Sequence, residues 1–312
     1  MINPGLLVAL KRHGILIAFA LILLGMSILS PDFRKLDNLL NIVRQAAVYH
    51  GIMAVGMTFV ILTGGIDLSV GSMLALAGIL CATLEHRGWP IPLLVALTLF
   101  LGCLMGLVNG LVITKAKVTP FVVTLGTMSI ARGLALIANN AQPISRFGRD
   151  FHFLGAGEVL GVPVPILIFL LSVVVAAVVL KRTRLGRYVY AIGGNADAAR
   201  LSGINVDFHT TMAYVICGLT SALGAIVLTS RLDSAEATAG VGYELDVIAS
   251  VVIGGTSLSG GRGSVWSTLV GALLIGTINN AMNLLEISSN YQAVVKGVII
   301  VAAVVLDRIR GD

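Results

Sequence analysis

The stretch IPLLVALTLFLGCLMGLVNGLVI, residues 91–113, decides the fold class because it contains no charged side chain. A helix needs about 20 consecutive, mostly apolar residues to cross the hydrocarbon core of a bilayer. The sequence therefore predicts an all-α fold, a polytopic transmembrane helix bundle with about ten spans. The nine further runs are 14–30, 46–63, 70–84, 119–138, 164–180, 210–230, 247–258, 265–284 and 292–306.

The composition of the chain indicates lipid rather than water as its surrounding solvent. Of the 312 residues, 57% are hydrophobic and 12% are charged, whereas a soluble domain has roughly 25% charged residues. The mean hydropathy is +0.97. The 36 glycines also fit a membrane protein, because small residues let transmembrane helices approach each other closely.

The number of complete crossings stays open at two places. The run 247–258 is short, and only a short turn separates 46–63 from 70–84. Eight or nine crossings with broken or re-entrant pieces fit the hydropathy almost as well. Lys11 and Arg12 precede the run 14–30 as in a signal peptide, but no small-residue cleavage site follows it. We expect that run to be retained as the first helix.

The loop lysines and arginines predict the orientation of the chain. Cytoplasmic loops of membrane proteins are enriched in these residues, so the distribution favours both termini in the cytoplasm. The same rule explains the net charge of +6 without nucleic acid as a partner. On this orientation, the twelve inside residues are Lys11, Arg12, Lys115, Lys117, Lys181, Arg182, Arg184, Arg187, Arg200, Arg262, Arg308 and Arg310, and the seven outside residues are Arg34, Lys35, Arg44, Arg87, Arg146, Arg149 and Arg231.

No motif in the chain predicts catalysis or metal binding. The phosphate loop G-x-x-x-x-G-K-[ST] is missing, as are the nucleophile elbow G-x-S-x-G and the metalloprotease motif H-E-x-x-H. The three cysteines and five histidines show no ligand spacing. We therefore expect no catalytic residue, no metal and no cofactor in this chain.

Three charged residues lie in or beside predicted spans. Asp67 sits in GGIDLSVGS, where one helix ends and the next begins, so it is predicted to cap the next helix or to act at a gate. Arg132 is deeper in its span than Lys296 is. Lys296 is expected to extend to the lipid interface, whereas Arg132 is predicted to face the protein interior and to organise the pore.

Two other features bear on function. The predicted outer loop 231–246 carries four carboxylates, and the predicted inner loop 181–209 is the largest inner segment. The sequence GGIDLS at 64–69 is also similar to GGTSLS at 254–259. Internal repeats are common in transporters, but chance similarity between glycine-rich helices is an equal alternative here.

Several segments resemble the signature sequences of bacterial ribose-type sugar permeases, the membrane subunits of binding-protein-dependent ABC importers. The resemblance covers nearly the whole chain. It rests on GGIDLSVGS (64–72), TRLGRYVYAIGGNADAARLSGINV (183–206), GYELDVIASVVIGGTSLSGGRG (242–263), AVGMTFVILTGG (54–65), TLGTMSIARG (124–133) and SSNYQAVVKG (288–297).

The resemblance implies a single permease domain, residues 1–312, that imports a monosaccharide, with ribose the leading candidate, across the bacterial inner membrane. It also implies a homodimer, a cytoplasmic ABC ATPase that binds ATP and Mg, and a periplasmic sugar-binding protein. One alternative is an ion-driven secondary sugar transporter. Such carriers need carboxylates inside the membrane, and here every Asp and Glu is predicted in or beside a loop. A membrane-embedded enzyme is disfavoured by the missing motifs.

A permease without a phosphate loop must receive work through a cytoplasmic contact, and 181–209 is the segment expected to provide it. Asn195 is predicted to cap a short helix that Gly203 terminates. Outside, the acidic residues of 231–246 are predicted to dock the binding protein. The coupling residues are Gly193, Gly194, Asn195, Asp197, Ala198, Ala199 and Arg200, with Ala198, Ala199 and Leu201 as the apolar face; the docking residues are Asp233, Glu236, Glu244 and Asp246.

Overall fold

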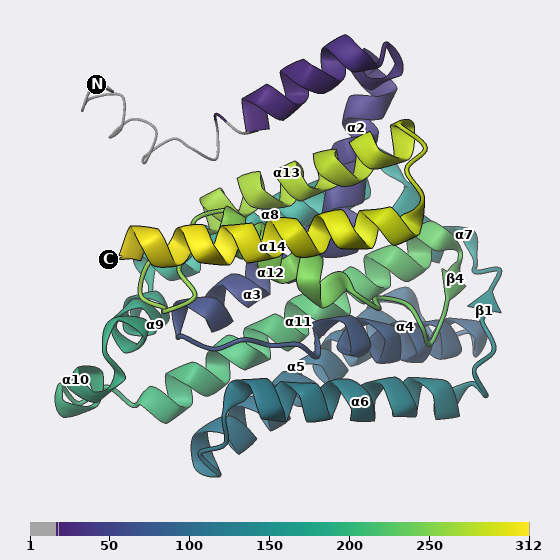
Figure 1. Ribbon diagram of the computed structural model, residues 1–312. Helices are drawn as coiled ribbons and strands as arrows, with labels where there is room; N and C mark the ends of the chain where they lie inside the picture. Colours follow the sequence, from purple (N-terminus) through teal and green to yellow (C-terminus); the bar gives the residue numbers. More distant parts are fainter. Residues whose placement is uncertain (1–16, 18, 312) are drawn as a thin grey trace, which may run out of the picture.

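The computed structural model describes residue 17 and residues 19–311, and its helices lie side by side in one bundle (Figure 1). The first half of the chain forms the helix Phe19–Leu29, η1 Asp32–Arg34, α2 Leu36–Ala46, the π-helix η2 Ala47–Gly51, α3 Ile52–Leu62, α4 Val70–His86, α5 Ile91–Lys115, α6 Pro120–Ala138 and α7 Arg149–Ala156. The second half forms α8 Val164–Arg182, α9 Arg184–Gly194, α10 Ala196–Leu201, α11 Val206–Leu232, α12 Tyr243–Ile253, α13 Val265–Leu284 and α14 Ser289–Gly311.

Four two-residue strands lie at one end of the bundle. β1 Ile144–Ser145 pairs antiparallel with β4 Ser234–Ala235, with Ile144 opposite Ala235. β2 Glu158–Val159 pairs with β3 Val162–Pro163 in a tight hairpin. These strands tie down the connections at this end, and the predicted all-α class is confirmed.

Six of the described helices are long and apolar enough to cross a membrane. They are Leu36–Leu62, Ile91–Lys115, Pro120–Ala138, Val164–Arg182, Val206–Leu232 and Val265–Leu284. By contrast, α12 has 11 residues, which is about 16 Å at 1.5 Å per residue and only half of the hydrocarbon core. Lys11 and Arg12, which were predicted to be cytoplasmic, and the start of the predicted span 14–30 lie outside the described residues.

The second predicted span begins ten residues earlier than the hydropathy indicated, at Leu36 instead of residue 46. Polar residues lower the hydropathy of this turn, but the protein interior provides partners for them. Asn38 and Asn280 of α13 donate amide hydrogen bonds to each other at 3.1 and 2.9 Å. Side-chain amides paired in this way are compatible with a helix in the membrane.

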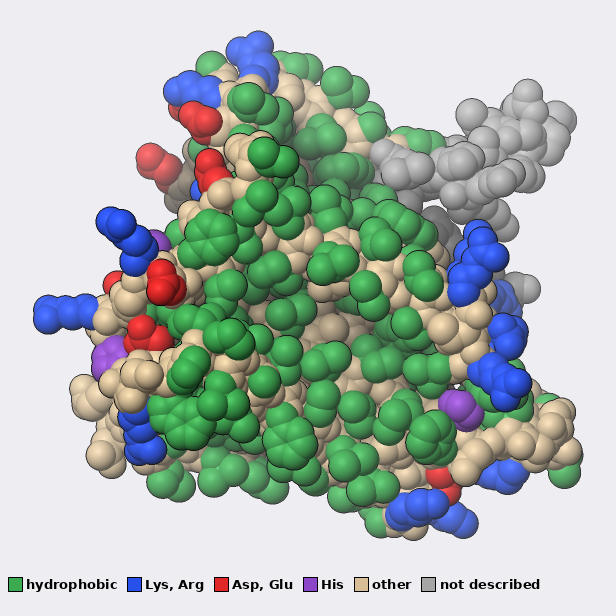
Figure 2. All heavy atoms as spheres, turned by 180° about the vertical axis from the view of Figure 1, so that it is seen from behind, with side chains coloured by type: hydrophobic (Ala, Val, Ile, Leu, Met, Phe, Trp, Pro, Cys, Tyr) green, Lys and Arg blue, Asp and Glu red, His purple; other side chains and the backbone are tan. Residues whose placement is uncertain are grey.

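The centre of the bundle is α3, in which every residue is buried. It packs against α8, α11, α12 and α13. Large apolar side chains also point outward elsewhere, among them Phe100 of α5, Phe121 of α6 and Leu171 of α8. Figure 2 shows a belt of hydrophobic side chains across one face of the molecule, with Lys and Arg gathered toward its two edges. This is the surface of a protein surrounded by lipid.

Glycine permits the close crossing of α5 and α11. A Cβ added at Gly102 would overlap the carbonyl oxygen of Gly218, and one added at Gly218 would overlap that of Gly102. One turn further, a Cβ at Gly106 would overlap the carbonyl oxygen of Tyr214. The two backbones therefore touch directly, as small-residue interfaces in membranes allow.

We predict that Gly218→Leu lowers the stability of the detergent-solubilised protein by about 1–3 kcal/mol, the typical cost of overpacking. The leucine would force α5 and α11 apart. Thermal unfolding followed by size-exclusion chromatography measures the change. Gly126→Leu in α6 is the matched control, because nothing lies within 4 Å of a Cβ there. Equal loss of stability in both variants would contradict the close crossing.

Candidate functional site

Three short segments outside or at the ends of helices meet at the end of the bundle where α3 and α9 terminate. The backbone N–H of Gly261 donates a hydrogen bond to the carbonyl oxygen of Leu62 at 3.0 Å. A Cβ added at Gly193, in the last turn of α9, would overlap that same carbonyl oxygen. Gly260 and Gly261 both have positive φ, +83° and +72°, a conformation that favours glycine. We call residues 62–64, 193–194 and 260–261 the inner junction.

The predicted short helix of the inner loop is present as α10. The side-chain Oδ1 of Asn195 accepts a hydrogen bond from the backbone N–H of Ala198 at 2.9 Å, so Asn195 is the N-cap as predicted. Gly203 follows the helix with φ +81°, and Ile204 donates to the carbonyl of Ala199. The sequence reading missed the longer α9 before it, in which Gly193 and Gly194 end a helix.

The exposed face of α10 differs from the predicted one. Ala199 is only 5% exposed, because it packs toward the body of the protein, so its place on the outward apolar face was wrong. Asp197, Ala198 and Arg200 are exposed, and Asp197 and Arg200 form an ion pair at 3.3 Å. Leu201 is 90% exposed and is the large apolar side chain that α10 offers to a partner.

Asp67 does not cap α4, because the N-cap of that helix is Ser69. The carboxylate is fully buried, and its Oδ1 accepts a hydrogen bond from the backbone N–H of Ser69 at 2.9 Å. Asn109 of α5 donates to the Ser69 hydroxyl at 3.0 Å and lies 3.5 Å from Asp67 Oδ2. Asp67 thus ties the extended segment 63–69 to α5.

Arg132 faces the protein. Its Nη1 donates hydrogen bonds to the backbone carbonyls of Ala237 and Ala239, the second at 2.7 Å. Beside this contact, a Cβ added at Gly71 would overlap the carbonyl oxygen of Gly240. Together α4 and α6 therefore hold the segment 236–240 in place.

The four carboxylates of 231–246 do not form one exposed loop. Asp233 accepts a hydrogen bond from the Phe147 backbone N–H at 2.9 Å, Glu236 is exposed, and Glu244 is half-buried. Asp246 lies inside α12, is 5% exposed and pairs with Lys296 at 2.8 Å. A docking role for Asp246 and an interfacial position for Lys296 were therefore both wrong, because each side chain is the other's partner within the bundle.

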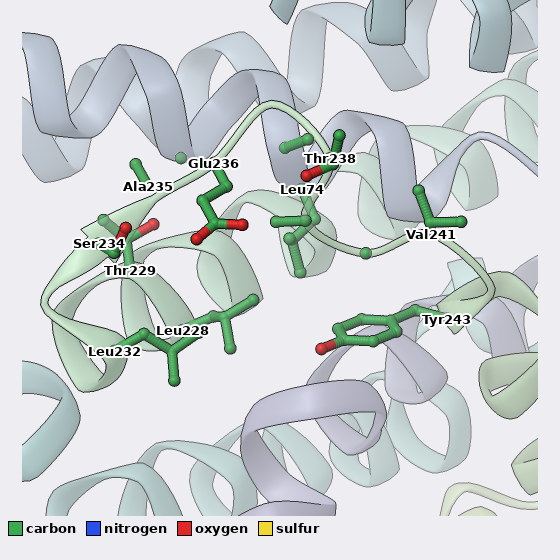
Figure 3. A pocket seen from close by; sticks show the side chains of 14 residues that line it. Leu74, Leu228, Thr229, Leu232, Ser234, Ala235, Glu236, Thr238, Val241 and Tyr243 are labelled. Carbon is green, nitrogen blue, oxygen red and sulfur yellow. The ribbon is translucent and has the colours of Figure 1, made fainter. Parts of the chain in front are cut away.

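A cavity of about 280 Å³ opens between α4, α11 and the segment 234–243. Figure 3 shows Glu236, Thr238 and Tyr243 arranged around it, with Leu74 and Leu228 beside them. The sequence reading singled out Glu236 as a docking residue and missed Tyr243. An acidic residue and a tyrosine in an otherwise small and apolar outer segment were the signal that could have found the cavity.

Comparison with known proteins identifies the class. Residues 38–304 match the family model described as "Branched-chain amino acid transport system / permease component". The chain therefore belongs to this family of transport permeases; it is a multi-pass membrane protein and the permease component of an ABC importer rather than an enzyme. Membership implies an ATPase subunit and a periplasmic binding protein as partners.

Within the family the chain is of the ribose type. It is 48% identical to the ribose import permease protein of Haemophilus influenzae, over 95% of this chain and 92% of that protein. It is 49% identical to the ribose import permease protein of Bacillus subtilis (96% and 93% covered) and 40% identical to the D-allose transport system permease protein of Escherichia coli (96% and 92% covered). No solved structure matches the chain.

The ion pair between the buried Asp246 and the partly buried Lys296 gives a prediction about stability. Asp246→Asn should cost about 3–5 kcal/mol, because it leaves the Lys296 ammonium without a counter-ion inside the bundle. Replacing both partners, Asp246→Leu with Lys296→Leu, should restore most of that loss. Thermal unfolding in detergent measures both variants.

Asp32→Asn is the control for the amide substitution. The Asp32 and Lys35 side chains are 64% and 69% exposed, so their ion pair should contribute little to stability. If Asp246→Asn unfolded at the same temperature as the parent protein, the pair would have no role in holding α12 to α14.

Proposed function

We propose that this chain is the translocation subunit of an importer that carries ribose across the bacterial inner membrane. The observation that carries the proposal is 47–49% identity to ribose import permease proteins over nearly the whole chain. The D-allose and L-arabinose transport permeases of Escherichia coli match less closely, at 40% and 39%. The order of these sequence identities favours ribose over the other two monosaccharides as the substrate.

The topology that supports this function has about ten passages and both termini in the cytoplasm. Because α12 is only half a span long, we infer that α12 and the following segment 254–264 together make one passage. The end of the bundle with α9 and α10 is assigned to the cytoplasm by the excess of lysine and arginine in its loops. The end with β1–β4 then faces the periplasm (Figure 1).

Coupling to ATP hydrolysis is assigned to α9 and α10, with Gly193, Gly194, Asn195, Asp197, Ala198 and Arg200 as the coupling residues and Ala199 as the internal contact of α10. ATP and Mg are bound by the partner ATPase, and this chain needs no cofactor of its own. A partner that moves α10 moves α9 with it, because they are joined at Asn195. Gly193 then transmits the displacement to Leu62 and Gly261 at the inner junction, where only backbone atoms separate the helices.

On the outer side, the binding protein is proposed to dock on the surface around the cavity, with Asp233, Glu236 and Glu244 as its acidic residues. Carboxylates at such a rim act mainly on association rate and salt dependence. A second copy of this chain completes the transport unit. The whole of 1–312 is proposed to act as one permease domain, with Asp67 and Arg132 holding its inner and outer segments.

Uptake of labelled sugars tests the function directly. A strain without its own ribose permease should import labelled ribose when it makes this chain with its ATPase and binding protein, and should import labelled hexose more slowly. Import that depends on a proton or sodium gradient instead of ATP, or preference for a sugar other than ribose, would overturn the respective part of the proposal.

We predict that Leu201→Asp weakens association with the ATPase by about tenfold or more, because it removes a large apolar contact from a small interface. Co-purification of the ATPase at increasing salt measures it. Leu160→Asp is the matched control, since Leu160 is 100% exposed at the opposite end of the bundle. If the ATPase failed to co-purify with the Leu160 variant but still co-purified with the Leu201 variant, the end of the bundle with β1–β4 would be the cytoplasmic one.

A further inference from the structure

The cavity beneath the segment 234–243 has the size of a small-ligand site. Its volume is about 280 Å³, just below the range of about 300–1,000 Å³ for ligand pockets. Its floor is formed by α4 and α11 and its roof by the segment between β4 and α12. It is a recess on the outer side of the bundle, where a sugar would enter.

Polar groups without protein partners line this recess. Figure 3 shows the Glu236 carboxylate and the Tyr243 phenol directed into it from the roof, with Thr229 on the α11 side. Among the described residues, no side chain or backbone group makes a hydrogen bond to the Glu236 carboxylate, the Tyr243 hydroxyl or the Thr229 hydroxyl. Thr229 is only 4% exposed, so its hydroxyl has little access to solvent except through the cavity.

The roof is held in position by the protein. Arg132 binds two of its carbonyls, Gly240 lies directly against Gly71, and β4 is paired with β1. The Tyr243 ring packs edge-on against Tyr49, with 5.8 Å between ring centres. The backbone that carries Glu236 and the ring of Tyr243 are therefore held in place before a ligand arrives, which lowers the entropic cost of binding.

The chemistry of these groups fits a neutral monosaccharide. A carboxylate is only an acceptor, with two oxygens that can receive hydrogen bonds from neighbouring hydroxyls. The tyrosine provides an apolar ring and a hydroxyl, and Leu74 and Leu228 can contact the C–H groups of a sugar ring. An anionic sugar, such as a sugar phosphate, would be repelled by Glu236.

We infer that this cavity is an outer sugar subsite of the permease, in which Glu236 and Tyr243 select neutral, polyhydroxylated sugars. The inference rests on the proposed function, because it concerns the same translocated sugar. It gives Glu236 a contact with the sugar itself, beyond its place at the docking surface.

Two variants test the subsite in cells that contain the complete importer. Glu236→Gln and Tyr243→Phe should each lower the initial rate of ribose import by about tenfold, the effect of losing a charge-assisted or a buried hydrogen bond. Glu158→Gln is the matched control. It removes the same charge from the same end of the bundle, in the hairpin β2–β3 outside the cavity, and should import ribose at the parental rate.

A second measurement separates the subsite from docking. In Glu236→Gln, capture of the ribose-loaded binding protein by the purified importer should fall much less than import does, because Asp233 and Glu244 remain at the proposed docking surface. If capture fell as far as import did, Glu236 would act through docking alone and the subsite assignment would be wrong. If the parent chain imported ribose and both variants did so equally well, only the subsite would be overturned; a parent chain that imports no sugar would overturn the proposed function with it.

Occupancy can also be measured without relying on rates. A cysteine introduced by Thr238→Cys should react with a membrane-impermeant maleimide, with the parent chain as the background for its three cysteines. Ribose delivered by the binding protein should slow that labelling, whereas ribose 5-phosphate should not. Labelling that ribose leaves unchanged would contradict a sugar in this cavity.

Discussion

The contact between Leu62, Gly193 and Gly261 is the constraint on which the arrangement of this protein depends. The end of α3 presents a carbonyl oxygen that α3 itself cannot satisfy, because the last carbonyls of a helix have no partner within it. Gly261 supplies the hydrogen bond, and Gly193 can approach only because it has no side chain. Leu62 is fully buried, and a buried carbonyl without a hydrogen-bond partner is costly, so this meeting of three segments is fixed. The positions of the segments that lead into and out of this junction are determined by it.

One short helix connects that junction with the outer recess. The N-terminal residue of α12, Tyr243, lines the cavity, and the segment after α12 leads to Gly260 and Gly261. With 11 residues, α12 is too short to cross the membrane alone. Its N-terminal end lies at the cavity, and the segment after its C-terminal end reaches the inner junction. The Asp246–Lys296 pair joins the first turn of α12 to α14.

The features that sequence reasoning predicted well are local ones. The helix α5 follows from an unbroken apolar run, and α10 follows from Asn195 and Gly203, where the bonds that cap the helix span three to five residues. The errors concern partners that are distant in sequence. Asn38 was left out of a helix because Asn280 could not be foreseen as its partner. Asp246 was read as exposed because Lys296 lies fifty residues further along the chain.

The same reasoning explains why counting carboxylates in loops was a poor argument against an ion-driven carrier. Asp67 and Asp246 both belong to the buried part of the bundle. Asp67 is surrounded by hydrogen-bond donors from Ser69 and Asn109, and Asp246 has a lysine, so each has a structural partner. Lys296 pairs with Oδ2 of Asp246, whereas Oδ1 of Asp246 makes no hydrogen bond within the described residues. Partners so distant in sequence cannot be predicted from hydropathy. Family membership excludes the secondary carrier on independent grounds, and the two buried carboxylates then become part of how the helices are held together.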